Sequence, residues 1–317
     1  MAQKKEHVLY GNVRINEPTI REKLIKSIPF YVMMLLPMAY LLLFKYYPML
    51  GIQIAFKKYK IKGGIWGSPW IGFKHFVTFF ESPTSWTVIS NTLILSFYYL
   101  IASFPLPIVL AVALNECRSV KFRKVTQLVT YMPYFISTVV MVSMIIQFTD
   151  VSTGIINQFI KLFGGDAVNF MGFSKYFRSL YVWTGVWQST GYSAIVYLAA
   201  LSGVPLELYE AARVDGAGKF RRIINIDIPY IAPTIITLLI LNTGSILSIG
   251  FEKIYLMQNG ANLSVSEVIS THVYKMGILN SSFEYSTAVG LFNSVVNLIM
   301  VITVNTISNR VSQISVL

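Results

Sequence analysis

The sequence predicts an all-α membrane protein with six transmembrane helices, because its composition is strongly apolar and its apolar stretches are long. Of the 317 residues, 54% are hydrophobic and 13% are charged, and the mean hydropathy is +0.58. The charged share is about half that of an average soluble domain. Six stretches reach the length of about 20 mostly apolar residues that a bilayer requires. Each is too long for a strand, and a helix bonds all of its own backbone groups in lipid, so all six are expected to be helices.

The six predicted spans are separated by polar loops. In chain order they cover residues 28–47, 86–114, 125–148, 180–204, 231–251 and 288–307. Pro105 and Pro107 predict a kink or a split in the second span, which a membrane helix tolerates when neighbouring groups bond the freed backbone. The first span follows a basic lead, but no small-residue cleavage site comes after it, so we expect it to be retained and not removed as a signal peptide.

The distribution of Lys and Arg predicts that both termini are cytoplasmic in a multi-pass protein of the plasma membrane. Short, densely basic segments precede the first span and follow the second and fourth spans, and cytoplasmic loops carry such an excess. The first outside loop is also basic and weakens this bias. The predicted organisation is then a cytoplasmic N-terminal segment over residues 1–27, a six-span transmembrane domain over 28–310 and a cytoplasmic tail over 311–317.

Several classes of function lack their sequence signals. The net charge of +12 is spread over several loops, without the basic stripe and stacking aromatics of a nucleic-acid-binding domain. Cys117 is the single cysteine, and His7, His75 and His272 lie far apart in the sequence. The chain has no G-x-x-x-x-G-K-[ST] phosphate-binding loop. We therefore expect no nucleic-acid partner, no metal site, no catalytic residues and no cofactor bound by this chain.

Two of the outside segments have distinctive content. Phe73, Phe76, Phe79 and Phe80 recur at helical spacing and predict a short interfacial helix, although an aromatic belt would give the same pattern. The connection over residues 252–285, between the fifth and sixth spans, is long and polar. We interpret it as a candidate gate or docking surface.

A charged segment over residues 205–229 interrupts the apolar sequence between the fourth and fifth spans. Its later part reads EAARVDGAGKFRRIINIDIP. Pro205 suits the first turn of a helix, and two close glycines in the sequence DGAG predict a turn that ends it. A second short helix is predicted from Lys219 onward, and Pro229 is expected to end that helix.

The charged segment has the composition of a docking surface for a soluble partner. Ala211, Ala212 and Gly216 are small and would let another protein approach the backbone closely, while Glu210 and Asp215 offer carboxylates to a basic partner. The alternative is a plain solvated loop, in which Glu210 pairs with the arginine three residues later.

The predicted spans hold neutral polar groups and aromatics, with no Asp, Glu, Lys or Arg apart from their ends. This pattern argues against a proton relay and against a charged substrate held by a counter-charge. Aromatic planes beside amides suit sugar rings, and the candidate substrate contacts are Trp183, Trp187, Gln188, Tyr192 and Asn242. The alternatives are that the amides join helices to one another and that the tryptophans anchor the span at the membrane interface.

The charged segment resembles the signature of permease subunits in binding-protein-dependent ABC importers. That signature reads E-A-A, three residues, G, nine residues, I, one residue, L and P. The matching positions here are Glu210, Ala211, Ala212, Gly216, Ile226, Ile228 and Pro229, with Ile228 in place of the usual Leu. The sequence SPWIGFKHFVTFFESPTSWTVISNTL is similar to the start of the family's transport core. The opening LLPMAYLLLFKYYPMLGIQIAFKKYK resembles the carbohydrate branch, and the likeness covers residues 28–310.

The resemblance implies the ABC type I importer permease fold with a cytoplasmic coupling helix. It implies that Glu210, Ala211, Ala212, Asp215 and Gly216 contact a cytoplasmic ATPase, which binds ATP and Mg²⁺ in place of this non-enzymatic chain. The implied partners are a second permease subunit in a heterodimer, two ATPase subunits and an extracellular lipoprotein that delivers a sugar, expected to be an oligosaccharide. Two alternatives stay open: import of another solute such as a peptide, and a membrane scaffold or sensor that does not transport.

Overall fold

A computed structural model describes residues 9–10, 13–14, 20–244, 247 and 249–312. The chain forms two compact units, Met1–Gln53 and Ile54–Leu317. In the first unit, β1 (Leu9–Tyr10) pairs antiparallel with β2 (Val13–Arg14), a small addition to the predicted all-α architecture. The helix α1 (Ile20–Leu41) continues through a π turn over Leu42–Tyr46 into α2 (Tyr47–Met49) and a 3₁₀ segment over Leu50–Phe56.

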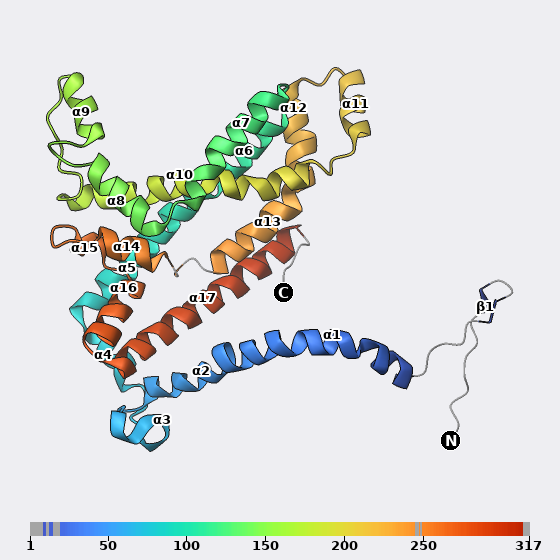
Figure 1. Ribbon diagram of the computed structural model, residues 1–317. Helices are drawn as coiled ribbons and strands as arrows, with labels where there is room; N and C mark the ends of the chain where they lie inside the picture. The colour runs from blue at the N-terminus through green and yellow to red at the C-terminus, as the bar shows by residue number, and fades with distance from the viewer. Residues whose placement is uncertain (1–8, 11–12, 15–19, 245–246, 248, 313–317) are drawn as a thin grey trace. The chain divides into compact units, whose positions relative to one another are not determined.

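The second unit is a helical bundle (Figure 1). Its first helices are α3 (Gly64–Gly67), α4 (Lys74–Glu81), α5 (Pro83–Ser103), α6 (Pro105–Asn115), α7 (Val120–Tyr131), α8 (Thr138–Phe148) and α9 (Ile155–Leu162). They are followed by α10 (Ser174–Leu201), α11 (Leu206–Val214), α12 (Lys219–Arg222), α13 (Ile228–Gly244), α14 (Phe251–Met257), α15 (Leu263–Ser266), α16 (Ile269–Tyr274) and α17 (Phe283–Ser312). Short 3₁₀ turns cover Ile61–Gly63 and Met132–Phe135, and π turns cover Ile223–Asp227 and Lys275–Leu279.

The described part of the chain holds four to six candidate membrane spans, and the upper figure equals the predicted number. Four are long and apolar enough to cross a membrane, namely Leu24–Phe56, Pro83–Asn115, Lys219–Gly244 and Phe283–Arg310. The count reaches six if two bent helix pairs, α7 with α8 and α10 with α11, each form one span. The second span is split at Phe104 into α5 and α6, directly before the two prolines that predicted a break. The predicted tail over residues 311–317 lies, from residue 313 on, outside the described residues.

The third predicted span is not one straight helix. The segments Val120–Phe135 and Thr138–Phe148 meet at an angle of 100°. Pro133 lies in the 3₁₀ turn that ends the first segment, where it lacks the backbone N–H that a continuing helix would need. Ser137 then caps the new helix, because its side chain accepts a hydrogen bond from the N–H of Val140. The proline and the serine cap together redirect the chain, and our expectation of a single helix was wrong here.

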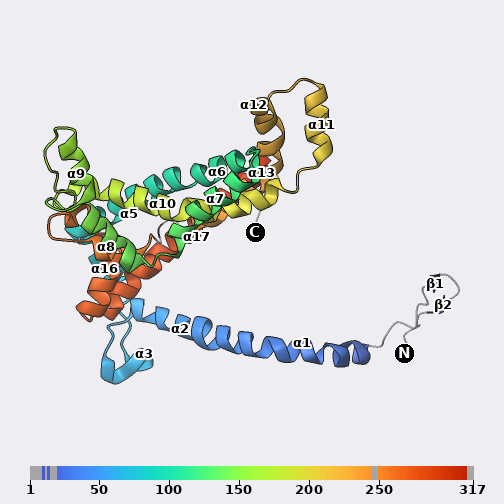
Figure 2. The same cartoon turned by 45° about the horizontal axis from the view of Figure 1, so that its top comes forward.

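The long helix α10 organises the core of the second unit, packing against α5, α6, α7 and α13. One buried cluster, which includes Leu95, Val182 and Ile254, joins α5, α10 and α14. A second, around Ala194 and Ile231, joins α10 to α13. The polar segments therefore collect at the ends of the bundle: α11 lies at one end, and α9 lies at the other (Figures 1 and 2).

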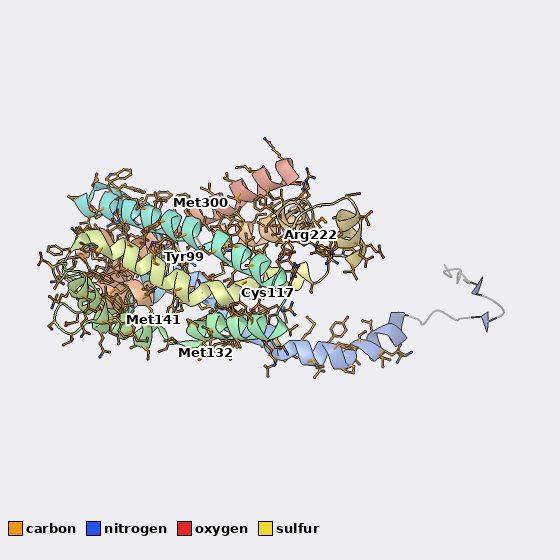
Figure 3. The ribbon with its side chains drawn as sticks, turned by 90° about the horizontal axis from the view of Figure 1, so that it is seen from above. Tyr99, Cys117, Met132, Met141, Arg222 and Met300 are labelled. Carbon is orange, nitrogen blue, oxygen red and sulfur yellow. The ribbon has the colours of Figure 1, made fainter. Side chains whose placement is uncertain are left out.

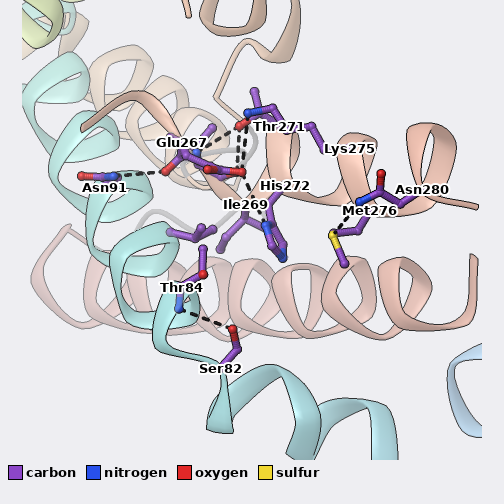
Figure 4. Close-up of polar contacts among 12 residues, drawn as sticks. Ser82, Thr84, Asn91, Glu267, Ile269, Thr271, His272, Lys275, Met276 and Asn280 are labelled. Atoms are coloured by element: carbon purple, nitrogen blue, oxygen red, sulfur yellow. Dashed lines mark hydrogen bonds and ion pairs between the residues drawn. The ribbon is translucent and has the colours of Figure 1, made fainter. Parts of the chain in front are cut away.

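The predicted loop over residues 252–285 is a folded part of the bundle. Glu267 lies 3.6 Å from a ring nitrogen of His272 and 3.6 Å from Nζ of Lys275 (Figure 4). The hydrogen bond from His272 and the positive charge of Lys275 lower the pKa of the Glu267 carboxyl, although burial opposes them. On the next helix turn, the backbone N–H of Ile269 donates to Thr92 of α5 at 2.9 Å. These bonds hold α16 against the spans.

The short helix predicted from the aromatic spacing is present as α4, directly before the second span. Phe79 is 1% exposed and packs with Val88, Ile269 and Val289 in a third buried cluster. Phe73, the residue directly before this helix, remains 68% exposed. The aromatic periodicity therefore serves two purposes, since one face of α4 packs on the bundle and the other stays outside it.

Candidate functional site

The charged segment between the fourth and fifth spans forms a short helix that stands out from one end of the bundle. Figure 1 shows α11 beside α12, joined to the bundle by its two connections. The second predicted helix, however, does not end at Pro229. It begins with α12 and continues through the π turn over Ile223–Asp227 into α13. In the π turn the N–H of Ile228 bonds to the carbonyl of Ile223, and this wider turn lets the helix pass the proline.

The predicted docking residues are accessible. The side chains of Glu210, Ala211 and Asp215 are exposed, and Ala212 is half-buried. Gly216 adopts φ +71°, a left-handed conformation that suits glycine at the end of a helix, and a Cβ added there would meet no other atom within 4 Å. The turn between α11 and α12 is therefore specified by its glycine and open to a partner.

Two apolar side chains beside this turn were missed by the sequence analysis. Val214 is 87% exposed and Phe220 is 75% exposed. An exposed apolar pair next to small residues is a feature of protein interaction surfaces. The sequence did carry a signal for both, because they are large apolar residues within an otherwise charged segment.

Ionic and hydrogen-bonding contacts fasten this protruding segment to the bundle. Glu116, just after α6, has its Oε2 3.5 Å from Nη2 of Arg222 and 3.7 Å from Nζ of Lys219. The Tyr209 hydroxyl donates a hydrogen bond to Oδ1 of Asp227, which is fully buried. Burial raises the pKa of the Tyr209 phenol to about 12, so the phenol remains a donor at neutral pH. These contacts connect α11 and α12 to the ends of the second and fifth spans (Figure 3 shows Arg222 at this end).

A polar and aromatic cavity lies inside the bundle between α5, α10, α13 and α14. One part of it has a volume of ≈ 410 Å³, with walls that include Tyr99, Tyr134, Tyr181, Gln188 and Asn242. An adjoining space of ≈ 360 Å³ shares several of these residues and reaches Tyr192. Figure 3 shows Tyr99 within the bundle. The rings of Tyr134 and Tyr192 stack with their centroids 3.8 Å apart.

The five candidate substrate residues are divided between two places. Gln188, Tyr192 and Asn242 line the polar cavity. Trp183 and Trp187 line a separate apolar hollow with residues of α6 and α7, and each is 53% exposed. Nε1 of Trp183 donates to the hydroxyl of Tyr98 at 3.0 Å. The structure therefore brings the amides and the tyrosine together and places the two tryptophans on another face of α10.

One charged side chain does reach the cavity, and the sequence analysis did not foresee it. Lys253 follows the fifth predicted span, and we assigned it to an outside loop. In the structure α14 turns back into the bundle, so Lys253 is 8% exposed and lines the cavity. Its Nζ donates to the carbonyl of Tyr181 at 3.1 Å and to Oγ1 of Thr184 at 2.8 Å. The predicted spans do lack charged side chains apart from their ends, but the connection that follows the fifth span brings a cation to the cavity.

Most of this chain is similar in sequence to known proteins. The sequence model of the family described as "Binding-protein-dependent transport system inner membrane component" matches residues 103–313. A relative from Bacillus subtilis (strain 168), named Protein LplB, is 43% identical over 283 residues, 89% of this chain and 89% of the relative. The polygalacturonan/rhamnogalacturonan transport system permease protein YteP of the same organism is 44% identical over 288 residues, 91% of this chain and 90% of the relative.

A solved structure has the same fold. It is described as a bacterial ABC transporter involved in the import of the acidic polysaccharide alginate. One of its chains superposes on this chain with a TM-score of 0.86 and 38% sequence identity, covering 93% of this chain and 100% of the other.

Proposed function

The chain belongs to the family of binding-protein-dependent transport system inner membrane components, and we propose that it is one permease subunit of an ATP-driven importer for an oligosaccharide. It is a multi-pass membrane protein with the permease fold of ABC type I importers. Under this proposal a binding protein delivers the sugar outside the cell, and ATP hydrolysis on other subunits drives its passage through the spans.

The observation that carries this proposal is the exposed part of the charged segment, which consists of α11 and the turn at Gly216. We call this part the coupling segment. We infer that Glu210, Ala211, Ala212, Asp215 and Gly216 contact a cytoplasmic ATPase, with Val214 and Phe220 adding apolar area. The contacts of Glu116 with Lys219 and Arg222 would carry a displacement of α11 into the second and fifth spans. Coupling requires that the ATPase hold this segment differently in its two states, since equal contact in both would transmit nothing.

The polar cavity supports a sugar as the transported solute. Gln188, Tyr192 and Asn242 are the proposed contacts, because amides match hydroxyl groups and aromatic rings match the apolar faces of sugar rings. The name of YteP and the description of the solved structure both refer to polysaccharides, and they favour the same class of solute. Trp183 and Trp187 face the apolar hollow and not the cavity, so we propose a structural role for them in place of a contact with the sugar.

An importer of this kind also needs other subunits. We propose a heterodimer with a second permease subunit, two ATPase subunits that bind ATP and Mg²⁺, and a lipoprotein as the binding protein. The coupling segment and both termini would face the cytoplasm. The end of the bundle that contains α9 and α14–α16 would then face the binding protein.

Reconstitution tests the function directly. In proteoliposomes that contain the full chain with its co-expressed permease and ATPase partners, a binding protein loaded with oligosaccharide is expected to accelerate ATP hydrolysis and to deliver sugar to the lumen. A rate of ATP hydrolysis that does not change when the loaded binding protein is added would favour a scaffold or sensor. Stimulation by a peptide-loaded binding protein, with none by the sugar-loaded form, would replace the oligosaccharide with a peptide.

Removing the Tyr209 hydroxyl is expected to weaken coupling. Tyr209→Phe leaves the buried carboxylate of Asp227 without this donor, which costs about 1–3 kcal/mol of local stability. We expect less sugar transported per ATP hydrolysed, with both rates measured in the same proteoliposomes. Tyr255→Phe is a matched control, because the described residues show ring contacts but no hydrogen bond for that hydroxyl. An unchanged transport ratio in Tyr209→Phe would contradict the tethering role.

A further inference from the structure

The ammonium of Lys253 has an unusual position for a cation. It is almost fully buried in the bundle, where its two hydrogen-bond acceptors, the Tyr181 carbonyl and the Thr184 hydroxyl, are neutral. An ammonium has three N–H donors, so two acceptors leave one donor unused. Among the residues that the structure describes, no carboxylate forms an ion pair with it.

Two other buried cations of the second unit lie away from the polar cavity, and one of them, Lys57, also has only neutral partners. Arg222 pairs with Glu116, with Nη2 and Oε2 3.5 Å apart. Lys57 donates to the carbonyl of Ile65 and lies over the ring of Trp70, 4.8 Å from its centroid. Neither of these cations lines the polar cavity, whereas Lys253 does. The described walls of that cavity contain Lys253 as their cation and contain no carboxylate.

The surroundings of Lys253 keep its ammonium open to the cavity. A Cβ placed on Gly185 would lie 3.3 Å from Lys253 Nζ and 2.8 Å from a ring carbon of Tyr99. Glycine at this position therefore leaves room beside the ammonium that any side chain would reduce. The ammonium also lies 5.1 Å from the centroid of the Tyr181 ring. A ligand held here would meet a positive charge and two aromatic rings at one end of the cavity.

Burying an ammonium without a counter-ion costs free energy, because the charge loses its hydration. Ionisable groups inside a membrane protein usually mark a ligand pathway. We propose that Lys253 is a specificity-determining residue that binds the carboxylate of a uronic acid unit, so that the transported oligosaccharide is acidic. This inference rests on the proposed import of an oligosaccharide. The carboxylate supplies the missing counter-charge, and the tyrosine rings and amides around it bind the rest of the sugar.

The same contacts allow a purely structural role, in which Lys253 only fastens α14 to α10 through Tyr181 and Thr184. The two roles differ in what they demand of the side chain. Fastening requires donors, whereas carboxylate binding requires positive charge. Lys253→Gln keeps amide donors and removes the charge, and Lys253→Arg keeps the charge.

Direct binding of two matched sugars tests the proposal. The intact importer complex is placed in lipid nanodiscs without its binding protein and without nucleotide. It is titrated with trigalacturonate and with the same trisaccharide after reduction of its carboxyl groups to alcohols. We expect the wild type to bind trigalacturonate at least about tenfold more tightly, because the loss of one partner of a buried charge pair strongly weakens binding.

The variants decide between the two roles. Lys253→Gln is expected to bind both trisaccharides equally, at the affinity of the wild type for the neutral sugar, and Lys253→Arg to retain the preference for the acidic one. A wild type without preference for trigalacturonate, or a Gln variant that keeps it, would overturn the proposal. If neither sugar binds while loaded binding protein still stimulates ATP hydrolysis, the acidic specificity fails and the importer function stands. The comparison within the wild type tests the acidic specificity even if a variant fails to assemble, and the charge-retaining and charge-removing variants assign that specificity to Lys253.

Discussion

Replacing Gly216 with valine is expected to abolish uptake while the chain still folds and inserts. Gly216 has φ +71°, where an L-residue is disfavoured by about 1–2 kcal/mol, and a β-branched side chain is especially unsuited. The new side chain meets no atom of this chain within 4 Å of its Cβ, so the bundle itself is not disturbed. The damage is confined to the shape of the turn and to the surface that the ATPase would contact. Uptake by intact cells, with membrane insertion measured on the same cells, checks this result.

Gly218 provides the matched control in the same turn. Its φ is −69°, which any residue adopts, and its Cβ position is equally open. Gly216→Ala should therefore reduce uptake and the ATP hydrolysis that loaded binding protein stimulates, whereas Gly218→Ala should leave both near wild type. Normal uptake by Gly216→Val would contradict the docking of this turn on a partner.

The second large effect is expected at Gly191, where α10 crosses α7. A Cβ on this glycine would lie 2.0 Å from the carbonyl oxygen of Thr130 and 2.4 Å from its carbonyl carbon. These are backbone atoms, so no side-chain rotation relieves the overlap and the two helices must separate. Overpacking of a core costs about 1–3 kcal/mol or more, and close approach of small residues is a main source of helix association in membranes. We expect Gly191→Ala to lower the thermal stability of the purified chain in detergent markedly.

Gly290 in α17 is the control for the same substitution. It also lies within a helix, but its Cβ position has no neighbouring atom within 4 Å. Gly290→Ala should be neutral or slightly stabilising, since alanine favours a helix over glycine by up to about 1 kcal/mol. Equal melting temperatures for the Gly191 and Gly290 variants would show that α7 and α10 do not approach as closely as the structure has them.

Local rules explain why much of the architecture could be predicted. The length of each apolar stretch follows from the thickness of the hydrocarbon core, so spans such as residues 86–114 and 288–307 lie within the observed helices. The glycines in the sequence predicted the turn after α11, and the prolines predicted the split at Phe104. The helix α4 followed from aromatic spacing alone. Each of these features depends on residues that are close together in the sequence.

Which face of a span meets the cavity could not be predicted by the same means. Along α10, Trp183 and Trp187 face an apolar hollow, while Gln188 and Tyr192 face the polar cavity. In a soluble protein the apolar face would identify the core. In a membrane both the lipid and the packed interior are apolar, so the pattern of hydrophobicity does not distinguish them.

The sequence by itself determined that the chain is a helical membrane protein and that a helix ended by a glycine turn follows the fourth span. The tertiary structure decided that Lys253 enters the cavity, because only the fold of α14 against α10 carries that side chain back into the bundle. It also decided that Glu116 meets Arg222, a contact between residues more than a hundred positions apart in the chain. Spans and turns depend on local composition and backbone chemistry, whereas the environment of a charge depends on which distant helices pack around it.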